Sequence, residues 1–210
     1  MEVVDKVCHV KEIAVQKGRP REFCPEEALD KALHVFWRQG YEGASLTDLT
    51  EAMGISRPSL YAAFGNKDDL FRRALDRYSE TGPGAVQREA LDQPTAKAVV
   101  ERMLRGAAEC LTDPDNPRGC LAVQGALSCG EAAESIKNEL CGRRAAGEAA
   151  LRARFERAKA DGDLNAEADP QALARFVVTV QQGMSVQAAG GASRDDLMAV
   201  AEMALKAWPA

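Results

Sequence analysis

The chain has 210 residues, of which 46% are hydrophobic, 5% aromatic and 28% charged, and its formal net charge is −5 at pH 7. This composition is too apolar for a disordered chain, and no apolar run approaches the ~18 residues of a membrane span. Because the net charge is negative, nucleic-acid binding would have to come from a local basic patch.

The N-terminal residues and the cysteines exclude further classes of protein. Residues 1–20 alternate charges with short apolar pieces and are expected to form a flexible basic arm, without the apolar core of a secretory signal. The chain has six cysteines and two histidines, with no Cys-x-x-Cys pair. We therefore expect reduced, mostly buried thiols, no metal site and no cofactor.

From Pro25 onward the hydrophobic pattern is helical almost throughout, and strand patterns are missing. Helices are expected at about 25–39, 46–53, 57–64 and 67–79. Ser45, Ser56 and Asn66 have the positions of N-caps. Gly40 and Gly54 have the positions of helix ends.

The segment 81–84 (Thr-Gly-Pro-Gly) is the strongest helix breaker in the chain, and a domain boundary is expected there. Longer helices are expected beyond it, at about 95–111, 119–128, 132–160, 170–188 and 194–207. The predicted fold class is therefore all-α, with about nine helices in all.

The most informative unit is the pair of short helices 46–53 and 57–64, joined by the three-residue turn 54–56, which is a helix-turn-helix spacing. The second helix would place a guanidinium, hydroxyls and small apolar groups in a major groove. Hydroxyl and ammonium groups at helix starts, and basic residues of the arm, could hold phosphates. The predicted DNA-contacting residues are Arg19, Arg21, Thr47, Ser56, Arg57, Pro58, Ser59, Tyr61, Ala62 and Lys67.

Residues from about 18 to 78 resemble the DNA-binding domain of the TetR family of bacterial transcriptional regulators, of the AcrR-like kind. The resemblance is carried by Gly18-Arg19-Pro20-Arg21, by residues 32–43 with Phe36 and Gly40-Tyr41, by Leu46-Thr47-Asp48-Leu49, by 52–56 (Ala-Met-Gly-Ile-Ser) and by 60–70 (Leu-Tyr-Ala-Ala-Phe-Gly-Asn-Lys-Asp-Asp-Leu). It implies a helix-turn-helix domain over 21–66, a linker helix over 67–81, and an effector-binding and dimerisation domain over 82–210.

The same resemblance implies a cytoplasmic, nucleoid-associated bacterial repressor that is not an enzyme. Such a protein would bind a palindromic double-stranded operator as a homodimer and would be released by a small molecule. Helices 170–188 and 194–207 would form the dimer. The apolar character of the C-terminal helices suggests an apolar effector. The residues expected to line the effector pocket are Met103, Cys110, Cys120, Gln124, Phe155, Phe176 and Gln181.

Two alternatives remain open from the sequence. Cys120 follows Arg118 and Gly119 near a helix start, where a guanidinium and the helix dipole would activate a thiol, so the same fold could sense oxidants or electrophiles. A helical DNA-organising protein without a sensing site is the other alternative. An enzyme is not expected, because the sequence has no Gly-rich phosphate loop and no metal-ligand spacing.

Overall fold

The structure is a computed structural model that describes residues 23–127, 130 and 133–209. Within those ranges the chain is all-helical, with ten α-helices and no strand. The first four are α1 (Pro25–Gly43), α2 (Leu46–Met53), α3 (Arg57–Phe64) and α4 (Lys67–Glu80). The others are α5 (Gly82–Leu91), α6 (Ala96–Leu111), α7 (Leu121–Leu127), α8 (Glu134–Ala160), α9 (Pro170–Ala189) and α10 (Arg194–Lys206).

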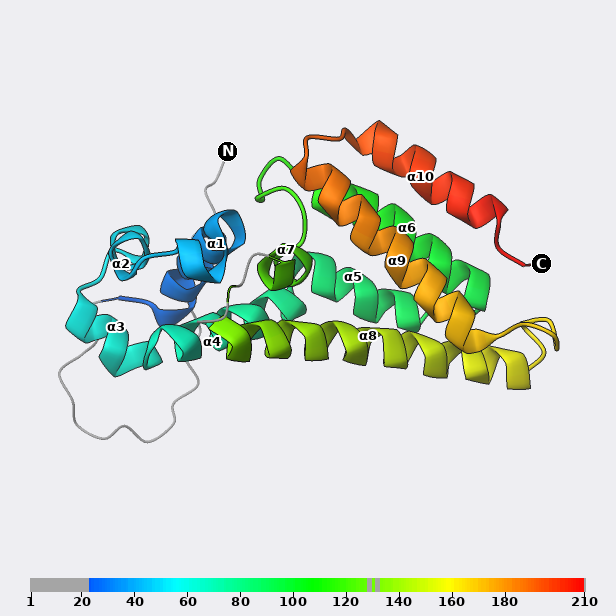
Figure 1. Ribbon diagram of the computed structural model, residues 1–210, viewed down its shortest axis with the longest axis horizontal. Helices are drawn as coiled ribbons and strands as arrows, with labels where there is room; N and C mark the ends of the chain where they lie inside the picture. The colour runs from blue at the N-terminus through cyan, green and yellow to red at the C-terminus, as the bar shows by residue number, and fades with distance from the viewer. Residues whose placement is uncertain (1–22, 128–129, 131–132, 210) are drawn as a thin grey trace, which may run out of the picture.

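The first three helices form one end of an elongated molecule, and the long helix α8 runs from that end along the rest of the body (Figure 1). Helix α9 lies across α8, and α10 forms the outermost layer over α9 and α6 (Figure 1). Helix α4 leads from the small end into the larger bundle, where α5 continues the chain (Figure 1). None of the described helices is long and apolar enough to cross a membrane.

The predicted bounds of α2 and α3 and the predicted starts of α1 and α4 are confirmed, because the local signals there are strong. Ser45 and Asn66 each form a capping box with the residue three positions on, and Ser56 accepts a hydrogen bond from the Ser59 amide. Gly40 interrupts α1 with φ 71° and ψ 177°, a backbone conformation that favours glycine. The end of the first helix at Gly40 was therefore predicted correctly, although a further turn follows it.

Helix α5 is the element that the sequence prediction missed. The sequence 81–84 looks like a loop, but Gly82 and Pro83 occupy the first turn of a helix, where a missing N–H does no harm. Val86 and Ala90 of this helix are buried, and α5 packs closely along α6. Burial against α6 therefore overrides the local breaker signal, and the chain has ten described helices rather than nine.

The buried apolar residues form two clusters, and the boundary between them does not follow the chain. The N-terminal cluster contains α1 to α4 but also Leu121, Ile136 and Leu140 from α7 and α8. The second cluster joins α6, α8, α9 and α10 around residues such as Phe155. The start of α8 thus belongs to the core of the small end. That arrangement ties the two parts together more firmly than a domain boundary at residue 81 suggests.

The capping box of α2 leads to a prediction about pH. Hydrogen bonds from Ser45 hold the pKa of the Asp48 carboxyl below its ordinary value. A lowered pKa in the folded state means that the stabilising contribution is complete above the unfolded pKa and is lost as the pH falls through the folded one. We expect Ser45→Ala to return the Asp48 pKa toward its ordinary value, as measured by NMR titration of the side-chain carboxyl carbons.

Asp196 provides the matched control, because Ser193 lowers its pKa in the same way at the start of α10. Its titration should be the same in the Ser45→Ala variant and in the unchanged protein. An Asp48 titration that the substitution leaves unaltered would show that the box is not formed in solution.

Candidate nucleic-acid interface

Helices α2 and α3 form a helix-turn-helix whose shape depends on the turn between them. Gly54 ends α2 in the left-handed conformation, with φ 69°. Ser56 then caps α3, so the turn has the three residues that the sequence predicted. Leu49, Leu60 and Phe64 are buried in the N-terminal cluster, which anchors both helices to the rest of this end. This packing leaves one face of α3 uncovered.

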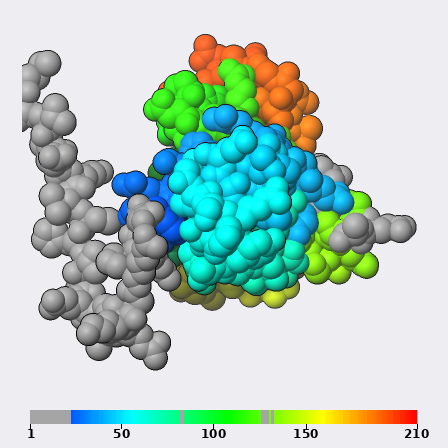
Figure 2. Space-filling view, turned by 90° about the vertical axis from the view of Figure 1, so that its left-hand side faces the viewer, coloured from blue at the N-terminus to red at the C-terminus, as the bar shows by residue number. Residues whose placement is uncertain are grey.

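The uncovered face of α3 presents most of the predicted contact residues to solvent. Arg57, Pro58 and Ala62 are exposed, and Tyr61 keeps 50% of its surface accessible although it is large and apolar. Ser59 is half-buried, and its hydroxyl lies 2.9 Å from that of Ser56. The first four helices face the viewer in Figure 2 and form a rounded end that could approach a duplex.

Arg57 is held in place rather than extended freely into solvent. Its Nη2 donates a hydrogen bond to Thr47 Oγ1 at 2.8 Å, and both residues are exposed. The contact brings the first turn of α3 beside the start of α2, where free backbone N–H groups favour an anion. Two predicted contact residues from different helices therefore form one small basic and polar site.

Lys67 lies at the start of α4 as predicted, but it is half-buried. Its Nζ lies 4.5 Å from the centroid of the Tyr41 ring, and burial lowers its pKa. The Tyr41 hydroxyl donates in turn to the Asp68 carboxylate. Lys67 thus packs on Tyr41, a residue that the sequence analysis did not place at this surface.

Arg73 is a further basic residue that sequence reasoning missed. It is exposed, and its Nη1 donates to the carbonyl oxygen of Ala63 at 3.0 Å, which fixes α4 to the end of α3. Its position on α4 gives no motif that links it to α3. Arg19 and Arg21 lie outside the described residues, so their predicted contacts with DNA remain predictions.

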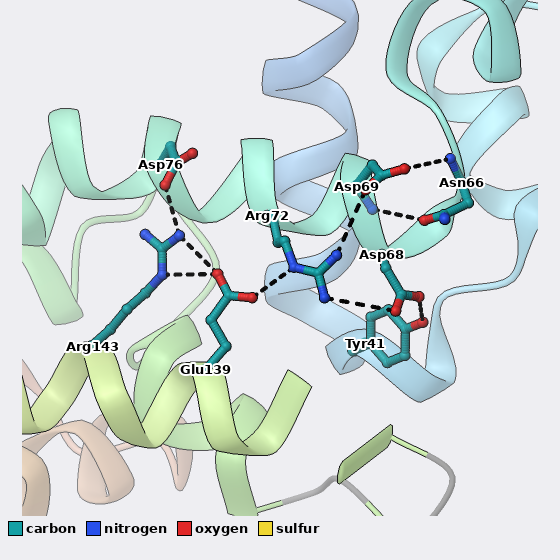
Figure 3. Close-up of polar contacts among 8 residues, drawn as sticks. All are labelled: Tyr41, Asn66, Asp68, Asp69, Arg72, Asp76, Glu139 and Arg143. Carbon is teal, nitrogen blue, oxygen red and sulfur yellow. Dashed lines mark hydrogen bonds and ion pairs between the residues drawn. The ribbon is translucent and has the colours of Figure 1, made fainter. Parts of the chain in front are cut away.

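A network of charged side chains connects this end of the molecule to α8 (Figure 3). Arg72 of α4 donates through Nε to Glu139 of α8 at 2.8 Å and lies 3.9 Å from Asp68. The other oxygen of Glu139 accepts from Arg143 Nη2 at 2.9 Å, and the same Nη2 donates to Asp76 of α4 at 2.7 Å. Two arginines therefore bridge α4 and α8 through one shared carboxylate.

A partly open cavity of about 150 Å³ lies between α4 and the helices of the larger bundle. Its wall contains residues from α4, α5, α6, α7, α8 and α9 and from the segment before α7. Among the predicted effector residues, Cys120 and Gln181 lie on this wall. Both arginines that follow Gly142 on α8, Arg143 and Arg144, also line it, although the sequence prediction did not include them.

The other predicted effector residues lie elsewhere. Met103 and Phe155 are fully buried in the second core, where Phe155 packs against Trp208. Phe176 is 39% exposed on the outside of α9. Cys110 and Gln124 are half-buried but are not part of the wall that the described residues form. Helical spacing identified apolar faces here but could not show which face turns toward the cavity.

The surroundings of Cys120 differ from those that the sequence suggested. Its thiol accepts a hydrogen bond from the Tyr78 hydroxyl at 3.2 Å, and burial raises the pKa of Tyr78 well above its ordinary value. Arg118 donates to the carbonyl oxygen of Ala192 instead of reaching the thiol. The helix that follows, α7, has only seven residues. The guanidinium that was expected to activate Cys120 is therefore engaged elsewhere.

The fold and site define a class: a helix-turn-helix protein with an exposed recognition helix and a separate cavity. Residues 28–74 match the family model described as bacterial regulatory proteins, tetR family. Residues 96–202 match the model of the tetracyclin repressor-like C-terminal domain. The chain belongs to the TetR family of bacterial regulatory proteins.

Individual relatives agree with this assignment. The chain is 37% identical to the HTH-type transcriptional repressor ComR of Escherichia coli K12 over 92% of each chain. It is 33% identical to the HTH-type transcriptional repressor BdcR of the same strain, over 89% of this chain and 90% of that one. A solved structure of a cysteine mutant of the TetR-family regulator CifR, complexed with 26-base-pair operator DNA, has a TM-score of 0.87 and 46% identity, and the match covers 91% of this chain and all of that one.

Proposed function

We propose that this protein is a transcriptional repressor that binds a palindromic DNA operator as a homodimer and releases it when a small molecule occupies the cavity. The observation that carries the proposal is the exposed face of α3, on which Arg57 is held beside Thr47. CifR, whose fold is closely similar, has been solved in complex with double-stranded operator DNA, which supports operator binding by this chain. Such a protein would act in the bacterial cytoplasm, at the nucleoid.

The outer faces of α9 and α10 support the homodimer. Phe176, Val186, Val200 and Met203 are large apolar residues that remain 39% to 65% exposed on these two helices. Large apolar side chains exposed to water favour burial against a partner, and two-fold pairing of one surface is the commonest way to achieve it. Ala188 and Ala201 of the same helices are buried within the chain, so the contact would use the exposed apolar residues.

The charged network gives a physical route from the cavity to the DNA-binding end. Arg143 lines the cavity and also holds Asp76 and Glu139, and Glu139 holds Arg72 of α4. A ligand that favours another position of Arg143 would loosen α4 from α8. Because α4 also carries Lys67 and contacts α3 through Arg73, its displacement would change the spacing of the two recognition helices. A ligand releases the operator only if it binds that second arrangement better.

The experiment that tests the proposal is a footprint of the full chain on the DNA upstream of its own gene. We expect a protected palindrome with half-sites about one helical turn, ~34 Å, apart. Protection of every fragment alike would contradict sequence-specific repression and would favour the DNA-organising alternative.

The proposed dimer interface on α9 and α10 predicts how a charge placed there would change the oligomeric state. Met203→Glu places a charge on the most exposed apolar residue of α10, so we expect sedimentation velocity to show a monomer and operator binding to weaken strongly. Ala153→Glu on the exposed side of α8 is the control and should remain dimeric. A dimeric Met203→Glu variant would place the interface elsewhere.

One observation still supports the thiol-sensing alternative: Cys120 lies on the cavity wall. If the thiol is the sensor, a Cys120→Ser variant would retain operator binding but would no longer be released by oxidants or electrophiles. Equal release of both proteins by such compounds would remove this alternative.

A further inference from the structure

The cavity wall carries a positive charge that no carboxylate of the described residues neutralises. Arg144 is half-buried on α8, and its Nη2 donates only to the soft acceptor Cys141 Sγ, at 3.3 Å. Its Nε is inaccessible to water and has no hydrogen-bond partner. Among the described residues no carboxylate lies within 4.0 Å of this guanidinium, although many other arginines have such a partner. A partly buried charge without a carboxylate partner is unfavourable, so this site favours an anion.

The other charged groups on the wall are already matched. Arg143 is held by Asp76 and Glu139. Glu148 accepts hydrogen bonds from Arg175 Nε at 2.7 Å and from Gln171 Nε2 at 3.0 Å. The charge left over on the described wall is therefore the single positive charge of Arg144. One guanidinium matches one carboxylate, with which it can form two parallel hydrogen bonds.

The rest of the wall indicates what the anion is attached to. Leu75, Val86, Leu111 and Val178 supply apolar surface, and Gln87, Gln181 and Gln182 supply neutral amides. A strongly hydrated dianion would lose its water against such a surface, whereas an apolar body would gain by burial. A volume of about 150 Å³ is close to that of a cavity that holds one benzene-sized molecule.

From these observations we propose that the cavity binds a small monocarboxylate with an apolar body, and that Arg144 holds its carboxylate. This inference rests on the proposed function, because it names the chemical class of the effector. The sequence predicted an apolar effector, and this proposal adds to it one carboxylate that makes a charge-assisted contact. Arg143, the preceding residue of α8, also lines the cavity, so a bound carboxylate would compete with Asp76 for its guanidinium.

The test measures ligand binding to the full chain by calorimetry without DNA. The probes are straight-chain and aromatic monocarboxylates of four to eight carbons, each paired with its primary amide. We expect at least one acid to bind more tightly than its amide. Arg144→Gln should weaken that acid about tenfold or more while leaving the amide unchanged, because only the charge-assisted contact is lost. Arg144→Lys should restore part of the affinity.

Arg157→Gln is the matched control, because Arg157 is an exposed arginine further along α8. It should leave the affinity for the acid unchanged. Without ligand, Arg144→Gln should keep or raise the melting temperature, since it removes an unpaired charge, whereas a structural role for Arg144 would lower it. If no acid binds more tightly than its amide, or if Arg144→Gln weakens acid and amide equally, the inference is overturned.

Operator release is measured separately, so the two proposals can fail independently. An acid that binds through Arg144 but does not release the operator would leave the site in place and contradict the proposed role of the cavity. Operator binding without any preference for acids would contradict the inference and leave the repressor function standing.

Discussion

Replacing Arg57 with alanine is expected to remove most of the specific affinity for the operator. A well-placed arginine contact with a base or phosphate contributes about 1–3 kcal/mol, and a dimer would lose two of them, which corresponds to a loss of roughly 30-fold to 10⁴-fold. The side chain is exposed, and its hydrogen bond to Thr47 is a surface contact, so the fold should survive. Fluorescence anisotropy with labelled operator at several salt concentrations measures the effect.

The control for this substitution is Arg157→Ala, which removes an exposed arginine from the end of α8 that is remote from α3. It changes the net charge by the same amount and should leave operator affinity nearly unchanged. Equal losses for the two variants would mean that the effect comes from overall charge and that Arg57 does not contact the operator.

The second large effect is expected for Phe71→Ala, which should lower the free energy of unfolding by about 3–5 kcal/mol. Phe71 is fully buried, and its ring meets Phe36 edge-on at 4.9 Å and Tyr41 at 5.2 Å. Its loss would leave a cavity beneath the Tyr41 ring on which Lys67 packs. Urea unfolding at several protein concentrations would separate this loss from any change in dimerisation.

Phe155→Ala is the matched comparison, because Phe155 is equally buried but lies in the second core. Both variants should be destabilised to a similar degree. At a temperature where both remain folded, we expect only Phe71→Ala to weaken operator binding, since it disturbs the packing beneath the start of α4. Equal weakening by both would indicate a general loss of stability instead.

The sequence predicted structure correctly where a residue's role depends on its neighbours in the chain. Ser45, Ser56 and Asn66 cap helices at the predicted positions because an N-cap needs only the three residues that follow it. The helix-turn-helix and its exposed residues follow from the same local rules. Lys67 was placed correctly on its helix, but its partner Tyr41 is a contact between α1 and α4 that no local pattern reveals.

The prediction of the cavity was much less complete, for a physical reason. Helical spacing shows which residues share a face, but Met103, Phe155 and Gln181 can be assigned to core or cavity only when the helices are packed. The bridge from Arg72 to Glu139 joins residues 67 positions apart, so its existence depends on how α4 lies against α8. Arg144 looks like an ordinary solvated arginine in the sequence, whereas the packed helices half-bury it without a carboxylate partner among the described residues.

By itself the sequence determined the all-helical class, the positions of the caps, the helix-turn-helix and the residues that α3 exposes, because each depends on short-range geometry. Tertiary structure decided that residues 82–91 form a helix, that α7 and α8 contribute to the N-terminal core, and that the cavity lies beside Arg143 and Arg144. These features come from burial and charge pairing between distant segments, whose free energies arise only when the helices are assembled.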